Sequence, residues 1–182
     1  MEQTTPQGPE PTDVKTPIGK FIKQCIEIAA LLKELETQAH LIHLNYEGAN
    51  FLGIHSFLKE QYEAHLDQFD KMGEYVRSMD YLMPMCSKGL RSAASKFDHV
   101  DSYKGGTQLY VYSQNLEELA MKCKKLEPVA MKIGAIDIGN YLAELTGDAF
   151  KAAWMVKASL RWLLLFIVKN AMTVCTDCLA FF

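Results

Sequence analysis

The spacing of hydrophobic positions along the chain predicts four long helices. Apolar side chains recur at steps of three and four residues, which places them on one face of an amphipathic helix. This pattern covers four stretches, at about residues 17–46, 51–82, 107–133 and 136–168. The sequence contains no strand-like alternation of useful length. Four long helices without strands indicate an all-α protein that folds as a four-helix bundle.

The residues at the borders of these stretches are typical of helix ends. Thr16 can cap the first helix, and Pro17 suits its first position, where a backbone N–H is not needed. Residues 48–50 (Gly-Ala-Asn) have turn chemistry and separate the first two helices. Gly134 is a predicted C-cap of the third helix, and Pro128 predicts a kink or a late break in it.

A long connection joins the second helix to the third. Pro84 ends the second helical pattern, and residues 84–104 contain Gly89 and several serines. A short helix is predicted within this connection, near residues 88–97. The second and third helices are therefore joined by a long crossover rather than by a tight turn.

The length and composition fit one globular domain with a short tail at each end. The chain has 182 residues, of which 49% are hydrophobic and 23% charged. Residues 1–16 hold three of the six prolines and few large apolar side chains, so we expect a flexible tail. The bundle should occupy residues 17–168, followed by a C-terminal extension over 169–182. The net charge of -3 argues against a nucleic-acid-binding domain, which is usually basic.

The cysteines and the first residues suggest a cytoplasmic protein. The five cysteines are scattered along the chain, as is typical of reduced intracellular thiols, at Cys25, Cys86, Cys123, Cys175 and Cys178. The polar, acidic start of the sequence lacks the pattern of a secretory signal. The longest apolar run, residues 162–168, is much shorter than the roughly 20 residues that span a bilayer, so we expect no membrane association.

Two histidines and two carboxylates form the most informative constellation in the sequence. His43 and His55 lie on either side of the glycine turn, and Asp70 and Glu74 follow on the second predicted helix. The two acidic residues are four positions apart, which puts them on one face of that helix. Imidazole and carboxylate ligands together suit iron, zinc or manganese. The constellation therefore predicts a metal site.

Helix geometry limits how these four residues can meet. His55 and Asp70 are fifteen positions apart on one predicted helix, which separates them by about 22 Å. A metal ion holds its ligands within about 2 to 2.5 Å, so one ion cannot reach both. Either the four residues are unrelated, or a second copy of the chain brings its carboxylates to the histidines of the first.

The spacing of these residues resembles the signature of the Dps family, also called miniferritins. The pattern H-x-N-x-x-G-x-x-F-x-x-x-H-x6-Y-x7-D-x3-E runs without a gap through His43, Asn45, Gly48, Phe51, His55, Tyr62, Asp70 and Glu74. Residues 153–158 (AWMVKA) are similar to the Trp-containing end of the family, and the likeness covers about residues 17–160. The sequence contains no E-x-x-H, the ligand pair of ferritins that bind iron within one bundle.

The resemblance implies a ferritin-like bundle that assembles into a closed shell, in this family a dodecamer. It implies that ferrous iron binds between subunits, is oxidised by hydrogen peroxide or oxygen, and is stored as a ferric mineral. His43 and His55 would be ligands from one subunit, and Asp70 and Glu74 from its partner, with Glu74 bridging two metal positions. The alternative is a structural shell or a nucleoid-associated DNA-binding protein whose metal site is degenerate.

Three departures from the family pattern bear on the second iron position. The usual Trp after the first histidine is Leu44, and Lys59 stands where the family often has aspartate, four residues after His55. The usual Ala-Glu-Arg end of the motif is Gly73-Glu74-Tyr75. The charged ammonium of Lys59 has no lone pair to coordinate iron and would repel a second ferrous ion. We therefore expect at least one iron per site and a turnover slower than that of a complete site.

The remaining histidines and cysteines carry weaker signals. His40 lies three residues before His43, so it is either an auxiliary ligand or a surface or core histidine. His65 and His99 match nothing in the motif and are assigned no function. The pair Cys175 and Cys178 forms a CxxC, which we interpret as incidental thiols because no second thiol pair accompanies it.

Two further family properties depend on charge. DNA binding through the N-terminal tail is not expected, because residues 1–20 carry three acidic side chains against two lysines. Asp137, Glu144 and Asp148, near the start of the fourth helix, are candidates for acidic pores that admit iron at three-fold axes. For each of them, a solvated helix face is the competing interpretation.

Overall fold

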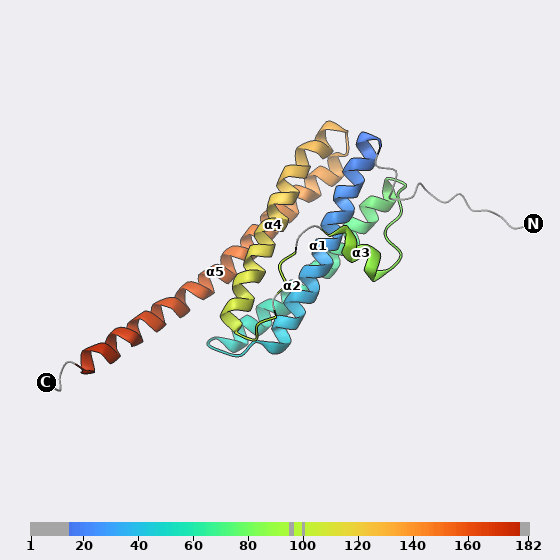
Figure 1. Ribbon diagram of the computed structural model, residues 1–182. Coiled ribbons are helices and arrows are strands. Elements are labelled where there is room, and N and C mark those ends of the chain that lie inside the picture. The colour runs from blue at the N-terminus through green and yellow to red at the C-terminus, as the bar shows by residue number, and fades with distance from the viewer. Residues whose placement is uncertain (1–14, 95–96, 100, 179–182) are drawn as a thin grey trace, which may run out of the picture.

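The computed structural model describes residues 15–94, 97–99 and 101–178, with side chains as far as residue 161. Within this part the chain forms helices and no strand (Figure 1). The helices are α1 (Pro17–Asn45), α2 (Phe51–Ser78), α3 (Ser87–Ala93), α4 (Gly105–Lys132) and α5 (Ile136–Cys178). Most of the predicted flexible tail and the last four residues lie outside the described part.

The four long helices pack in two antiparallel pairs. Helix α1 packs along α2, and α4 packs along α5, while α1 also lies against α4. The short helix α3 belongs to the crossover between α2 and α4 and lies against α1 (Figure 1). Contacts between α2 and α5 are few. The predicted all-α four-helix bundle with a long crossover is therefore confirmed.

The bundle core contains the apolar stripe that the sequence pattern marks on α1. Phe21, Ile22, Leu32 and Leu35 are 0% exposed. They pack with buried apolar side chains of the other three long helices, including Tyr112 of α4. Burial of this stripe supplies the main driving force that holds α1 inside the bundle.

The helix ends follow local chemistry, and the predicted end of α2 was wrong. The Thr16 hydroxyl accepts a hydrogen bond from the N–H of Gly19 at 2.9 Å, as expected of an N-cap. Gly134 follows the end of α4 at φ 83°. Helix α2 ends at Ser78 rather than near residue 82, because Asp80 takes a left-handed φ of 65° and the N–H of Tyr81 bonds back to the carbonyl of Val76.

A polar cluster fixes the crossover to the bundle. The Asn115 side-chain amide donates to Gln38 Oε1 at 3.0 Å and to the Asp98 carbonyl at 2.9 Å. Its Oδ1 accepts from the N–H of Asp98 at 3.2 Å. Asn115 is on α4 and Gln38 on α1, so this cluster joins both helices to the returning chain. The short crossover helix ends at Ala93, four residues before the predicted limit near 97.

Helix α5 is much longer than its predicted end near residue 168. It continues to Cys178 and is 43 residues long, against 29 or fewer for the other helices. Figure 1 shows its second half leaving the bundle. Cys175 and Cys178 lie in its last turn, and their side chains are outside the described part. Among the described helices, none combines the length and apolar character needed to cross a membrane.

Candidate metal centre

The turn between α1 and α2 sets the position of the candidate site. The turn comprises residues 46–50. Gly48 has a φ of 148° and Asn50 a φ of 59°, both in the range that most residues other than glycine avoid. The Tyr46 hydroxyl donates to the carbonyl of Ala49 at 2.9 Å across this turn. The ring of Tyr46 is buried against Gly105, the first residue of α4. The turn is therefore held both within itself and by the bundle.

This turn places the side chains of His43 and His55 next to each other. Their rings stack with centroids 3.7 Å apart and planes inclined by 20°. Nδ1 of His43 lies 2.8 Å from the carbonyl oxygen of His55, and Nδ1 of His55 lies 3.0 Å from the carbonyl oxygen of His43. Each histidine is thus fixed by the backbone of the other, and both side chains are partly buried.

These hydrogen bonds determine which nitrogen of each ring can bind a metal. A carbonyl oxygen only accepts, so Nδ1 carries the proton and donates in both rings. In a neutral imidazole the proton on Nδ1 leaves Nε2 with a free lone pair. Metal-binding histidines commonly donate their other N–H to a carbonyl in this way, which fixes the ring and raises its basicity. Nε2 of both histidines is therefore free to act as a metal ligand.

Aromatic side chains surround the pair on the same side of the bundle. The ring of Phe51 stacks on His55 at 5.1 Å. The ring of Tyr62 meets His43 edge-on at 5.5 Å and stacks with His40 at 4.2 Å. His40 thus belongs to the same cluster, with its ring 6.1 Å from that of His43. The sequence spacing left its orientation open, and the packing of α1 on α2 decides it.

Lys59 lies one helical turn after His55 on α2, in the position where the family often has a carboxylate. Its ammonium is 3.8 Å from Oε1 of Glu63, and both side chains are more than half exposed. An exposed pair of this kind contributes little to stability. The lysine therefore places a positive charge one helical turn from His55 without being essential to the fold.

Asp70 and Glu74 do not reach the histidines within one chain. Both are exposed near the far end of α2, and the unbroken helix confirms that Asp70 follows His55 by fifteen helical residues, or about 22 Å. Within the described residues, no group of three or more His, Cys, Asp and Glu side chains could hold a metal ion. The structure thus brings the two histidines together and leaves the two carboxylates as a separate, solvent-facing pair.

A buried polar network in the bundle core was missed by the sequence analysis. His65 is 3% exposed, its Nδ1 is 3.0 Å from Gln68 Oε1, and its Nε2 is 2.9 Å from the hydroxyl of Tyr112. Burial lowers the pKa of His65 to about 4, although Gln68 and the charge of Glu36 oppose this effect. One signal was available, because His65 lies seven residues from both Leu58 and Met72, which are 0% exposed.

The other candidate residues have mixed surroundings. Asp137 and Asp148 are exposed on the bundle half of α5, and Glu144 Oε2 is 3.2 Å from Nζ of Lys71 on α2. His99 is exposed in the crossover, beside Phe97. The structure shows none of these four residues in contact with the histidine pair, and the pore role of the acidic residues stays a prediction.

The described cysteines have the properties of structural thiols. Cys25 and Cys123 are buried between α1 and α4, and burial raises the pKa of each thiol to about 12. They are therefore protonated and poorly nucleophilic near neutral pH. Cys86 is exposed and caps α3 by accepting a hydrogen bond from the N–H of Gly89.

Known proteins share this fold. Dps from Listeria innocua superposes with a TM-score of 0.72 at 21% identity, covering 77% of this chain and 95% of that one. A Dps homologue from the archaeon Halobacterium salinarum gives 0.74 at 20%, with 85% and 87% covered. Dps from Vibrio cholerae, described as a member of a broad superfamily of ferritin-like diiron-carboxylate proteins, gives 0.73 at 18%, with 79% and 91% covered.

The sequence itself matches one family model. No curated protein sequence matches the chain. Residues 27–161, which include the histidine pair, the carboxylates and most of the bundle, match the model of the ferritin-like domain. The chain therefore belongs to the ferritin-like family, and its fold is that of the Dps proteins.

Proposed function

We propose that this protein is a miniferritin that binds ferrous iron between two copies of its chain, oxidises it and stores the ferric product. The observation that carries the proposal is the reciprocal hydrogen bonding of His43 and His55, which leaves Nε2 of both rings free to bind a metal. A histidine pair that served only the packing of α1 on α2 would not require both rings to have the same metal-binding tautomer.

The carboxylates of a second copy would complete the site. Asp70 and Glu74 are exposed and share a face of α2, so a neighbouring chain can reach them. A two-fold axis that runs two copies of α2 past each other in opposite directions brings the carboxylates of each copy to the histidines of the other. Such a dimer holds two equivalent sites, and further symmetry of this kind would build the closed, dodecameric shell that the family resemblance implies.

The ligand set suits the oxidation of iron, which is the substrate of the reaction. Imidazole nitrogens accept the incoming ferrous ion, and the carboxylates favour the more highly charged ferric ion, so together they promote electron loss. Two ferrous ions give one electron each to hydrogen peroxide, which takes up two protons and leaves as two water molecules. Glu74 is the residue we assign to bridging two iron positions.

The neighbouring structures support a metal function of this kind. The Vibrio cholerae Dps is described as related to diiron-carboxylate proteins, and the Listeria innocua Dps was soaked with zinc. Zinc and manganese accept the same ligands as iron, so the ligand types do not distinguish the three metals. We propose iron because of the redox chemistry of the reaction.

A mixed assembly of two variants tests the proposal. One variant carries His43→Ala with His55→Ala, the other Asp70→Asn with Glu74→Gln, and each alone should oxidise ferrous iron with peroxide at the background rate. Co-expression of the two should restore about one quarter of the sites, because a random pair then combines intact histidines with intact carboxylates. The measurement is the initial rise of ferric absorbance, with His99→Ala as the control variant.

Three outcomes would count against the proposal. Mixed assemblies that stay at background while wild type is active would exclude a site shared between copies. A double histidine variant as fast as wild type would remove the metal role of the pair. If wild type itself stays at background, the alternative of a structural shell with a degenerate site is favoured.

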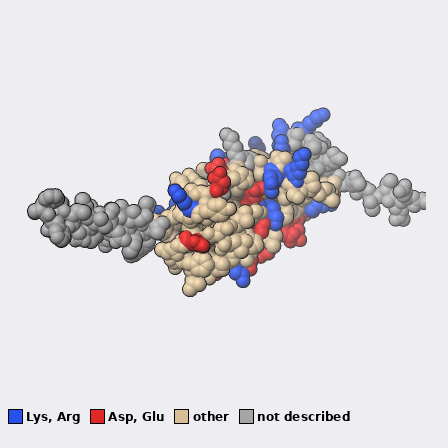
Figure 2. All heavy atoms as spheres, turned by 60° about the horizontal axis from the view of Figure 1, so that its bottom comes forward, with Lys and Arg blue, Asp and Glu red and all other residues tan. Residues whose placement is uncertain are grey.

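A second candidate function, DNA binding, is favoured by one surface. Figure 2 shows basic side chains on the right half of the view, with acidic side chains between some of them. At the end of the bundle where α1 begins and α4 ends, six exposed lysines form no ion pair among the described residues: Lys15, Lys20, Lys23, Lys124, Lys125 and Lys132. Lysines without an ion pair can neutralise phosphates, and four of these six lie outside the acidic tail of residues 1–20.

A gel-shift assay at near-physiological salt tests this second candidate. If the surface binds DNA, wild type should retard a linear duplex, and Lys124→Glu with Lys125→Glu should abolish the shift. Lys151→Glu, on the middle of α5, is the matched control and should leave the shift intact. An unshifted duplex with wild type would rule this function out.

A further inference from the structure

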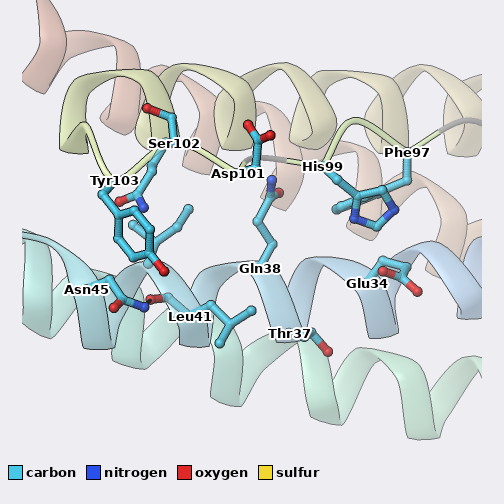
Figure 3. A pocket seen from close by; sticks show the side chains of 12 residues that line it. Glu34, Thr37, Gln38, Leu41, Asn45, Phe97, His99, Asp101, Ser102 and Tyr103 are labelled. Carbon is cyan, nitrogen blue, oxygen red and sulfur yellow. Dashed lines mark hydrogen bonds between the residues drawn. The ribbon is translucent and has the colours of Figure 1, made fainter.

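A pocket of about 270 Å³ lies between α1 and the crossover, and neither His43 nor His55 lines it. Figure 3 shows it from close by, with Leu41 and Asn45 of α1 on one side and the crossover residues His99 and Tyr103 on the other. The side chain of Tyr103 reaches across toward Leu41 and Asn45, although it is 84% exposed. Gln108, in the first turn of α4, also lines the pocket.

Gln108 has an unsatisfied hydrogen-bond acceptor. The residue is 7% exposed, and its Oε1 is the one buried side-chain oxygen or nitrogen in the described part of the chain without a hydrogen-bond partner. The neighbouring buried amides of Gln38 and Asn115 are both bonded. A buried acceptor without a donor is unfavourable in the free protein, and a ligand with an N–H or O–H group can remove that cost.

The other groups that line the pocket restrict the chemistry of such a ligand. The Asn45 amide donates through Nδ2 to the carbonyl of Leu41, so its Oδ1 is left to accept. The carboxylates of Glu34 and Asp101 also line the pocket. That of Glu34 is paired with Nε of Arg91 at 3.0 Å, so Asp101 is the lining carboxylate without an ion pair among the described residues. Tyr103 offers an aromatic face, which attracts cations. These groups form an acceptor-rich and partly apolar pocket with one carboxylate, Asp101, left to attract a cation.

We propose that this pocket binds a small organic ammonium ion, with Gln108 Oε1 accepting from the ammonium N–H and the alkyl part lying against Leu41 and Tyr103. A neutral alcohol of the same size could donate to Gln108 but would gain nothing from the charge of Asp101 or from the Tyr103 ring. A carboxylate of the same size would be repelled. Binding would tie the crossover to α1 and would not depend on the metal site.

Titration calorimetry of the full chain with n-butylammonium tests the proposal, with 1-butanol and butyrate as size-matched controls. We expect saturable binding of the ammonium ion in about the millimolar range, as suits so few non-hydrogen atoms, and at least tenfold weaker binding of both controls. The variant Gln108→Leu should weaken ammonium binding at least tenfold while its unliganded melting temperature stays equal or rises, since an unsatisfied acceptor is removed. Gln114→Leu, an exposed glutamine of the same helix, is the matched control.

A second pair of variants covers the case in which Gln108→Leu does not fold. Tyr103 is exposed, so Tyr103→Leu and Tyr103→Phe should both fold, and the leucine variant should bind several-fold more weakly than the phenylalanine variant. Absence of saturable binding to wild type would overturn the proposal. So would equal affinity for 1-butanol, or unchanged binding by both Gln108→Leu and Tyr103→Leu.

Discussion

At the scale of single residues, the candidate centre depends on backbone groups as much as on the histidines. His43 and His55 each donate to the main-chain carbonyl of the other, so no third side chain is needed to orient them. A side-chain partner would lose conformational entropy when it became ordered. The backbone carbonyls that accept these hydrogen bonds are already ordered, because the turn fixes the ends of both helices. Among the departures from the family pattern, Lys59 is the one that adds a positive charge one turn from His55.

Replacing Lys59 by aspartate should raise the iron capacity of the site. A carboxylate supplies oxygen ligands and removes the repulsion of a second ferrous ion, so we expect Lys59→Asp to bind close to two iron ions per site and to oxidise them faster than wild type. Lys59→Gln, which removes the charge without adding a ligand, should fall between the two. Anaerobic titration with ferrous iron measures the stoichiometry. Wild type that already binds two ions tightly and equally would contradict the proposed role of Lys59.

At the scale of elements, the turn between α1 and α2 is held by its contact with the start of α4. A Cβ at Gly105 would lie 2.8 Å from the Tyr46 ring and 3.3 Å from the carbonyl oxygen of Glu47, which is closer than side-chain carbons normally approach. The glycine is therefore needed for a close approach rather than for an unusual φ. Because Tyr46 also braces the turn through Ala49, a shift at Gly105 would be transmitted to the histidine pair.

Substitution of Gly105 by alanine should therefore lower both stability and iron oxidation. We expect a loss of about 1–3 kcal/mol in the free energy of unfolding, the usual cost of overpacking. Gly147→Ala is the matched control, because its Cβ meets nothing within 4 Å on α5 and should stabilise the helix by up to about 1 kcal/mol. Urea unfolding and the initial rate of ferric formation are the two measurements. If Gly105→Ala were as stable as wild type, the close approach of Tyr46 would not require a glycine at this position.

At the scale of the whole molecule, the buried His65 makes the stability of the bundle depend on pH. In the folded protein its pKa is lowered to about 4 by burial, from an ordinary value of 6.5. Between these values the unfolded chain binds a proton that the folded chain refuses, so stability falls as the pH drops from 6.5 towards 4. The full effect is about 3 kcal/mol, because each pKa unit corresponds to about 1.4 kcal/mol. Protonation would also reverse the direction of the hydrogen bond between Nε2 and the Tyr112 hydroxyl, because a protonated Nε2 can only donate.

The variant His65→Gln should show a flatter decline of stability with acidity than wild type. Glutamine can still bond to Tyr112 but does not titrate, so the difference between the two proteins should shrink or reverse between pH 7 and pH 5. His99→Gln, an exposed histidine, should leave the wild-type slope unchanged. Thermal unfolding at the two pH values provides the comparison. Parallel slopes for His65→Gln and wild type would show that His65 does not cause the acid sensitivity.

The sequence by itself determined the helices and the identity of the candidate ligands. Local spacing is enough for both, because helix periodicity and the distance from His43 to His55 across one turn depend on residues close in the chain. The same spacing also showed that Asp70 cannot join His55 within one chain, because a single helix has a fixed rise per residue.

Only the tertiary structure decided which residues far apart in the chain meet. His65 bonds to Tyr112, 47 residues later, and no local pattern marks Tyr112 as its partner. The end of α2 at Ser78 depends on the left-handed conformation of Asp80, which its residue type permits but does not require. The unsatisfied Gln108 is likewise invisible in the sequence, because a polar residue on a helix is buried or exposed according to what the crossover places over it. Hydrogen-bond partners and burial depend on how distant segments of the chain pack together. The linear pattern of residues does not contain that information.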